Sequence, residues 1–140
     1  MADTFEIEIA TPERLLAREK AIRAQIPLKD GYVGMLPDHA PLLSELGIGA
    51  LTYTTPEDHR FSVAVRGGFL EVNNNVVRVL TEEAEKGQEI DVTRAEKDLK
   101  HAQDAMLDPA LGMDIAAALI AVRHAQARID AARKAATKEE

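Results

Sequence analysis

The first candidates for catalytic residues in this chain are Asp38 and His39, an aspartate directly followed by a histidine. A catalytic triad also needs a nucleophile close to the histidine in space. Ser44 is near in the sequence, but it does not stand in the Gly-x-Ser-x-Gly context that exposes a nucleophilic serine. We therefore expect His39 to be a structural or interface residue, and we expect no catalytic residue and no enzymatic activity.

Other reactive or ligand-binding patterns are missing from the sequence. The chain has no cysteine, and its four histidines show no metal-ligand spacing, so we expect no metal site. The glycines between Gly31 and Gly49 match neither the dinucleotide fingerprint nor the Walker loop. The formal net charge of −7, without a basic run, argues against nucleic acid as the main partner.

The residues from position 91 onward contain a group of charged side chains that could bind phosphate. Asp91, Arg94 and His101 would share one face of a helix, and His124 and Arg128 would share a face of a second. Arginines on facing helices can hold a phosphate through two hydrogen bonds each. The alternative is a solvated charged face, because an ion pair between Arg94 and Asp98 would be ordinary at this spacing. The residue types alone favour this alternative.

These residues must be positioned by two parts of the chain that differ in composition. The first 90 residues hold five of the six prolines and seven of the eight glycines, whereas residues 91–140 hold 14 alanines. Proline and glycine favour turns and alanine favours helix, so we expect strands first and helices afterwards. The turn-rich first part predicts an antiparallel sandwich or barrel. The expected strands lie in TFEIEIA (4–10), KAIRAQIPL (20–28), GALTYTT (49–55), RFSVAVRGG (60–68), FLEVNNN (69–75) and VVRVLTEEA (76–84), with a hairpin turn in VNNNVV.

The second part predicts two amphipathic helices separated by LDPALGMD, and hence an antiparallel hairpin. Thr93 and Glu96 fit a capping box, and Asp91 is a competing N-cap. Alanine dominates the expected packing faces, so the hairpin alone would be only marginally stable. It must therefore pack against the sandwich, against a partner, or against each in turn. The expected apolar positions are Ala95, Leu99, Ala102 and Met106 in the first helix, and Ile115, Leu119, Val122, Ile129 and Ala132 in the second.

Three motifs in order resemble a known family along nearly the whole chain. They are GYVGMLPDHAPLLSELGIG, RGGFLEVNNNVVRVLTEEAE and EIDVTRAEKDL. The chain is similar to the epsilon subunit of bacterial F-type ATP synthase. The resemblance implies an α+β fold, with an antiparallel β-sandwich over residues 1–88 and a regulatory two-helix hairpin over residues 89–140.

The resemblance also implies a function and partners. We expect a non-catalytic subunit of the central stalk that couples proton flow to ATP synthesis, bound to the gamma subunit and resting on the c-ring, with the hairpin restraining ATP hydrolysis at the alpha and beta subunits. With no signal peptide and no apolar run of the roughly 20 residues that a membrane span needs, we expect a soluble protein at the cytoplasmic face of the bacterial inner membrane, held there only through the complex. By position, the gamma-facing candidates are Pro37, His39, Pro41, Leu42 and Leu43, and the ring-facing candidates are Lys29, Asp30, Gly31 and Tyr32.

Some members of this family bind ATP on the folded hairpin, and here the matching positions are Glu85, Asp91, Arg94 and Arg128. His101 and His124 stand where such members carry arginine, and histidine lacks the guanidinium fork. We therefore expect no bound cofactor beyond weak or absent ATP; a module that senses ATP remains the alternative function. The expected inhibitory contacts are the cations of the second helix, Arg123, Arg128, Arg133, Lys134 and Lys138.

Overall fold

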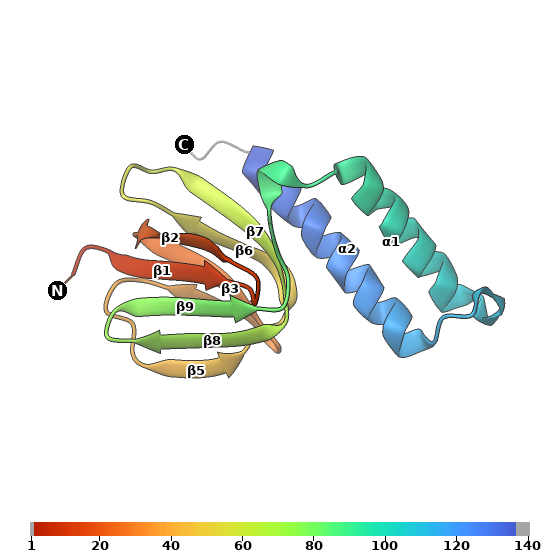
Figure 1. Ribbon diagram of the computed structural model, residues 1–140, viewed down its shortest axis with the longest axis horizontal. Coiled ribbons are helices and arrows are strands. Elements are labelled where there is room, and N and C mark those ends of the chain that lie inside the picture. Colours follow the sequence, from red (N-terminus) through yellow and green to blue (C-terminus); the bar gives the residue numbers. More distant parts are fainter. Residues whose placement is uncertain (1, 137–140) are drawn as a thin grey trace.

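A computed structural model describes residues 2–136 and shows a β-sandwich followed by a helical hairpin (Figure 1). Sheet A has the strand order β2-β1-β9-β8-β5, and sheet B has the order β10-β7-β6-β3-β4. The α+β fold and the sandwich-then-hairpin order predicted from the sequence are confirmed. The strands are β1 (Phe5–Ala10), β2 (Leu15–Ala21), β3 (Arg23–Leu28), β4 (Gly31–Met35), β5 (Leu42–Glu45), β6 (Ile48–Thr54), β7 (Arg60–Arg66), β8 (Gly68–Asn73), β9 (Val76–Thr81) and β10 (Ala84–Lys86).

The strand β1 shows how the sequence pattern sets the two faces of sheet A. Phe5, Ile7 and Ile9 are buried and the residues between them are partly exposed, as the alternation predicts. The strand pairs with β2 antiparallel and with β9 parallel, whereas the other strand pairs within residues 2–136 are antiparallel. The apolar inner faces of the two sheets form one core, whose largest fully buried side chains include Ile7, Ile9, Ile26, Met35, Leu51, Leu70, Val65 and Val79.

The turn between β8 and β9 is the predicted hairpin. Asn73 pairs with Val76, and the two residues between them, Asn74 and Asn75, have φ angles of 52° and 63°. Asparagine accepts this left-handed conformation more readily than most residues, which explains the Asn-Asn sequence. The side chain of Asn75 also accepts a hydrogen bond from the backbone amide of Asp38 and donates one to the carbonyl of Thr4, so the turn holds two other segments in place.

Four strands have no counterpart among the sequence-based predictions. These are β2, β4, β5 and β10, and each lies at the edge of its sheet. No strand was expected over residues 31–35, but Gly31–Met35 forms β4 and pairs with β3. An edge strand is paired on one side alone and buries few side chains, so its sequence lacks the regular apolar alternation of β1.

The hairpin consists of α1 (Val92–Leu107) and α2 (Ile115–Ala136), joined through the short 3₁₀ helix η2 (Pro109–Leu111). A second 3₁₀ helix, η1 (Gly87–Glu89), connects the sandwich to α1. Asp91 is the N-cap of α1, and its side chain accepts the backbone N–H of Arg94 at 3.1 Å. The competing cap is thus confirmed, and the capping box that begins at Thr93 was wrong because Thr93 lies inside the first turn.

The faces that join the two helices are made mostly of alanine. Ala95 and Ala102 are buried and Leu99 is half-buried, as predicted, but Met106, Ile115 and Leu119 are exposed by 36%, 69% and 37%. These three lie near the hairpin tip, which projects away from the sandwich (Figure 1), so no sheet covers them. The contact there is made instead by small residues, among them Ala105 and Ala118.

The α2 helix packs on the outer face of sheet B, over β6 and β7. Within residues 2–136, the buried cluster at this contact contains only two large side chains, Ile90 and Ile129, beside the alanines Ala50, Ala64, Ala95, Ala131 and Ala132. The hydroxyl of Ser62 on β7 donates to the backbone carbonyl of Ala131. Because an alanine contributes far less than a large apolar side chain, this seam is thin, in keeping with the prediction of a marginal hairpin.

Candidate functional site

The segment from Leu36 to Pro41 is a loop at the end of the sandwich that carries Asp38 and His39. The carboxylate of Asp38 accepts the backbone amide of Ala2 at 2.7 Å, and the Nδ1 of His39 lies 2.7 Å from the carbonyl of Ala40. The hydroxyl of Ser44 donates to the carbonyl of Glu45. The hydrogen bonds found for these three side chains are therefore all to backbone groups, and none of them joins His39 to Asp38 or to Ser44.

The gamma-facing candidates of the sequence analysis differ in how far they reach the surface. Leu43 on β5 is 74% exposed, and Pro41 is also exposed. Pro37 and His39 are half-buried, and Leu42 packs against the core of the sandwich. The strand β5 thus presents Leu43, rather than Leu42, on the outer face of sheet A.

That outer face carries an apolar row which the sequence analysis did not identify. Phe69 pairs with Leu80, Leu80 with Ala10, and Ala10 with Leu15, so the row crosses four strands. Leu15, Phe69 and Leu80 are exposed by 52%, 56% and 52%. We call Phe69, Leu80, Ala10 and Leu15 the apolar row. Its signal in the sequence is that β8 and β9 have large apolar residues on both faces, since Phe69 and Leu80 alternate with the core residues Leu70 and Val79.

Beside the apolar row runs a row of alternating charges. Glu71, Arg78, Glu8 and Arg18 are successive cross-strand neighbours on β8, β9, β1 and β2. Arg78 donates to both Glu71 and Glu8 at 3.1 Å, and Arg18 donates to Glu8 at 3.1 Å. These hydrogen bonds raise the pKa of the Arg78 guanidinium. Together the two rows give sheet A an exposed face with one apolar band and one compensated polar band.

The ring-facing candidates lie at the turn between β3 and β4. Leu28 pairs with Gly31, and Gly31 has a φ of 140°, which a side chain would disfavour. The ammonium of Lys29 lies 3.6 Å from the carboxylate of Glu45, and Asp30 is exposed. This places Lys29 and Asp30 at the projecting end of the hairpin between the two strands.

Tyr32 links this turn to the end of α2. Its hydroxyl accepts the backbone N–H of Ala50 at 3.1 Å, and the ammonium of Lys134 lies 5.8 Å from the centre of its ring. A cation at this distance from an aromatic face is attracted to it. The structure therefore brings together a ring-facing candidate and a cation that the sequence analysis assigned to inhibition.

Arg128 joins three elements in one ion-pair cluster. Its Nε and one terminal nitrogen donate to Glu85 of β10 at 2.8 and 3.3 Å, and its other terminal nitrogen donates to Asp98 of α1 at 3.5 Å. The Arg128 side chain is only 16% exposed, and its hydrogen bonds to Glu85 raise the pKa of the guanidinium. We call Glu85, Asp98 and Arg128 the hairpin cluster.

The four nucleotide-binding candidates are only partly brought together. Glu85 and Arg128 are in direct contact, Arg94 approaches the cluster through Asp98 at 3.7 Å, and Asp91 serves as the helix cap. A cavity of about 440 Å³ beside Arg128 is lined by four glutamates, Glu13, Glu82, Glu83 and Glu85, but by only two arginines. Carboxylates repel phosphate, so this lining favours weak nucleotide binding or none.

His124 stands at the edge of the same cavity, 3.4 Å from the carboxylate of Glu83. Burial lowers the pKa of its imidazole, and Arg66 and Arg128 lower it further against the opposing effect of Glu83. A neutral imidazole cannot replace an arginine as a phosphate ligand. His101 is exposed on α1.

The remaining cations expected to inhibit have different surroundings. Arg123 and Arg133 are exposed, whereas Arg128 is held in the hairpin cluster. Lys138 lies outside the described residues. Within residues 2–136, no helix is long and apolar enough to cross a membrane, and no three acidic, histidine or cysteine side chains form a group that could hold a metal ion.

Comparison with known proteins adds three kinds of similarity. The family model described as "ATP synthase, Delta/Epsilon chain, beta-sandwich domain" matches residues 4–87. The ATP synthase epsilon chain of Solibacter usitatus is 51% identical over 96% of this chain and 99% of the relative. That of Koribacter versatilis is 46% identical over 76% and 74%.

Among solved structures, a chain of the Euglena gracilis mitochondrial ATP synthase has a similar fold. It superimposes with a TM-score of 0.79 at 23% identity and covers 90% of this chain and 79% of its own length. A chain of the Tetrahymena thermophila mitochondrial ATP synthase, from a structure of its central stalk and c-ring, superimposes with a TM-score of 0.52 at 16% identity. At these identities the match concerns the fold.

Proposed function

The chain belongs to the ATP synthase epsilon-chain family, and on that premise we propose that it is a non-catalytic subunit of the central stalk that couples proton flow to ATP synthesis. Its partners in this role are the gamma subunit, the c-ring, and the alpha and beta subunits. It is held peripherally at the cytoplasmic face of the bacterial inner membrane by these contacts.

The observation that supports binding to the gamma subunit is the apolar row on sheet A. Half-exposed Phe69, Leu80 and Leu15 form, together with Ala10 of β1, a continuous band over four strands. Leu43 lies on the same outer face. A band of large apolar side chains on an otherwise charged sheet is typical of a protein-binding surface. The neighbouring charge row is already paired within the chain, so it can approach a partner without leaving isolated charges.

The Phe69→Asp variant tests this assignment in a binding titration with the gamma subunit. Covering an exposed large apolar side chain is worth roughly 1.5–3 kcal/mol, which corresponds to about a ten- to hundredfold weaker affinity when it is lost. The matched control is Leu107→Asp, which changes an 85% exposed leucine at the hairpin tip. Equal affinity of Phe69→Asp and the control would contradict a gamma contact at the apolar row.

For the hairpin, we propose that it restrains ATP hydrolysis by leaving the sandwich and reaching the alpha and beta subunits. The thin seam on sheet B should make the free-energy cost of detachment small, because among the described residues only Ile90 and Ile129 are large buried side chains there. The exposed Arg123 and Arg133 provide positive charge for contact with acidic surfaces of those subunits. In this scheme the hairpin cluster holds the folded state, because Arg128 bridges β10 and α1.

The Arg128→Gln variant tests the role of the cluster. Hydrogen bonds to charged groups contribute about 1.5–3 kcal/mol, and partial exposure of Glu85 and Asp98 reduces this to about 1–2 kcal/mol. The folded hairpin should therefore lose about one order of magnitude in population, and ATP hydrolysis by the complex should fall. Arg94→Gln is the control, since Arg94 is 73% exposed; an equal effect of both variants would contradict the scheme.

We predict that the chain binds ATP weakly or not at all. Arg128 already donates to two carboxylates, and the cavity beside it is lined by four glutamates. Calorimetric titration of the isolated chain should give no dissociation constant in the low micromolar range. A tight constant would favour the alternative of a module that senses ATP.

A further inference from the structure

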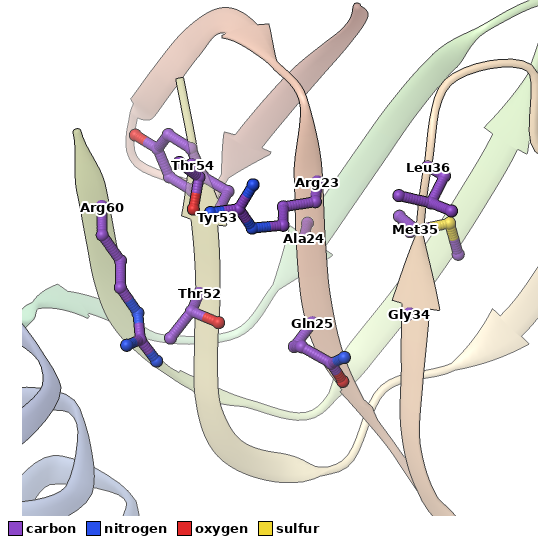
Figure 2. Close-up of a pocket in the computed structure, with 10 residues that line it drawn as sticks. All are labelled: Arg23, Ala24, Gln25, Gly34, Met35, Leu36, Thr52, Tyr53, Thr54 and Arg60. Atoms are coloured by element: carbon purple, nitrogen blue, oxygen red, sulfur yellow. The ribbon is translucent and has the colours of Figure 1, made fainter. Parts of the chain in front are cut away.

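The Leu36–Pro41 loop carries the chain from one sheet of the sandwich to the other. Figure 2 shows Met35 and Leu36 at the end of β4, where the loop leaves sheet B. Met35 is fully buried there, whereas Leu36 is 63% exposed. The loop enters sheet A at β5, which pairs with β8 close to the turn that contains Asn74 and Asn75. Its conformation therefore sets where the gamma-facing candidates within it lie at this end of the sandwich.

Asp38, in the middle of the loop, has an unusual backbone conformation. Its φ angle is 63°, a left-handed value that residues other than glycine seldom adopt, although aspartate accepts it more readily than most. Such a conformation persists where the surrounding structure holds it in place. The shape of the loop at Asp38 therefore depends on contacts from other segments.

The contact that holds the Asp38 backbone comes from the side chain of Asn75. The backbone N–H of Asp38 donates to the Oδ1 of Asn75 at 2.8 Å, and the Nδ2 of Asn75 donates to the carbonyl of Thr4 at 2.8 Å. The backbone carbonyl of Asn75 accepts the N–H of Glu6 at 3.2 Å. Because the side-chain amide accepts on one side and donates on the other, turning it over would break both hydrogen bonds. Asn75 therefore fixes the position of Asp38 relative to the start of β1.

The carboxylate of Asp38 makes a second connection to the same part of the chain. It accepts the backbone N–H of Ala2 at 2.7 Å. A hydrogen bond to a carboxylate is stronger than one between neutral groups. Ala2 and Thr4 both precede β1, so the two connections hold the loop against one segment. We call Ala2, Thr4, Asp38 and Asn75 the loop clamp.

The neighbouring Asn74 has the same backbone conformation as Asn75 but a different role. Their φ angles are 52° and 63°, so glycine suits both positions as well as asparagine does. Among the described residues, the side-chain hydrogen bonds to Asp38 and Thr4 come from Asn75 and not from Asn74. The two positions thus separate the turn conformation from the side-chain bridge.

We propose that Asn75 is a positioning residue for gamma binding. By holding Asp38 in its left-handed conformation, it keeps the loop in one arrangement. Pro37, His39 and Pro41 are then presented to the gamma subunit in place, and binding does not require the loop to be ordered first. The identity of the partner rests on the proposed function, whereas the hold of Asn75 on the loop is a property of the chain alone.

The first part of the test compares Asn75→Gly with the matched control Asn74→Gly in the isolated chain. Glycine allows the positive φ at both positions, so Asn75→Gly removes the bridge and leaves the turn. In Asn75→Gly, the NMR scalar couplings of Asp38 should no longer report one left-handed conformation, and its amide should exchange about two- to tenfold faster. Both measurements should be unchanged in Asn74→Gly.

The second part is a binding titration of the same variants with the gamma subunit. The affinity of Asn75→Gly should fall about two- to tenfold, in proportion to the lost population of the ordered loop. Asn74→Gly should bind as the unsubstituted chain does. Phe69→Asp, which changes the apolar row, should weaken binding without altering the couplings of Asp38.

Unchanged couplings of Asp38 in Asn75→Gly would overturn the proposal, and so would an altered loop with an unchanged affinity for gamma. An equal loss of affinity in Asn74→Gly would also overturn it, because the turn and not the bridge would then matter. If Phe69→Asp bound gamma normally while Asn75→Gly did not, the gamma contact at the apolar row would be wrong and the role of Asn75 would stand.

Discussion

Gly87 of η1 is packed closely against both α2 and β7, which makes it the sharpest test of the seam. A Cβ built at Gly87 would lie 2.3 Å from the carbonyl oxygen of Ala131, 2.4 Å from the Ser62 hydroxyl and 2.8 Å from the Cβ of Ala135. Two of these three atoms belong to α2, and the third, the Ser62 hydroxyl oxygen, donates a hydrogen bond to α2. Gly87→Ala therefore cannot be accommodated without moving the helix away from the sheet.

The size of the effect follows from these contacts. Overpacking a well-packed contact costs about 1–3 kcal/mol, and loss of the Ser62–Ala131 hydrogen bond costs about 1 kcal/mol more. The sandwich core is separate from this seam, so the substitution should destabilise the docking of the hairpin and leave the stability of the sandwich unchanged. A cost of about 2–4 kcal/mol corresponds to a roughly 30- to 1,000-fold rise in the population of the undocked hairpin.

Hydrogen exchange measured by mass spectrometry can follow the two domains at once. Peptides from α2 should lose protection in Gly87→Ala, while peptides from β1 and β9 should not change. Gly34→Ala is the matched control, since the Cβ there meets nothing closer than 3.5 Å. If α2 exchanged alike in the two variants, the close approach at Gly87 would not be what limits docking.

Two further predictions concern the helices. Asp91→Ala removes the side-chain cap of α1 and should cost about 0.5–2 kcal/mol; thermal unfolding followed by circular dichroism would measure this, and an unchanged midpoint would contradict the cap. His124 has a lowered pKa in the folded chain, so the unfolded chain takes up a proton first as the pH falls. The free energy of unfolding should therefore decrease as the pH drops below about 6.5. His124→Gln should flatten this decrease in urea titrations, and an unaltered pH dependence would show that other groups cause it.

The sequence predicted the fold wherever one face of an element is clearly buried. Alternation identified β1, and the Asn74–Asn75 pair identified the turn between β8 and β9. The edge strands β4 and β5 were missed because pairing on one side leaves little apolar pattern. The start of α1 depends on one side-chain hydrogen bond, and residue type alone could not decide between Asp91 and Thr93 as its N-cap.

The candidate sites were less predictable because they combine distant residues. Glu85 and Arg128 were named in advance, but Asp98 joins them only because α1 packs against α2. The apolar row needs the register of four strands, which no local pattern specifies.

The central claim is that this chain is a rotor subunit whose hairpin restrains ATP hydrolysis. The most direct measurement is the ATPase rate of the reconstituted complex containing the chain without residues 91–140. We predict a higher rate than with the full chain, with the shortened subunit still bound to gamma through the sandwich. An unchanged rate from a complex that retains the shortened subunit would contradict the claim.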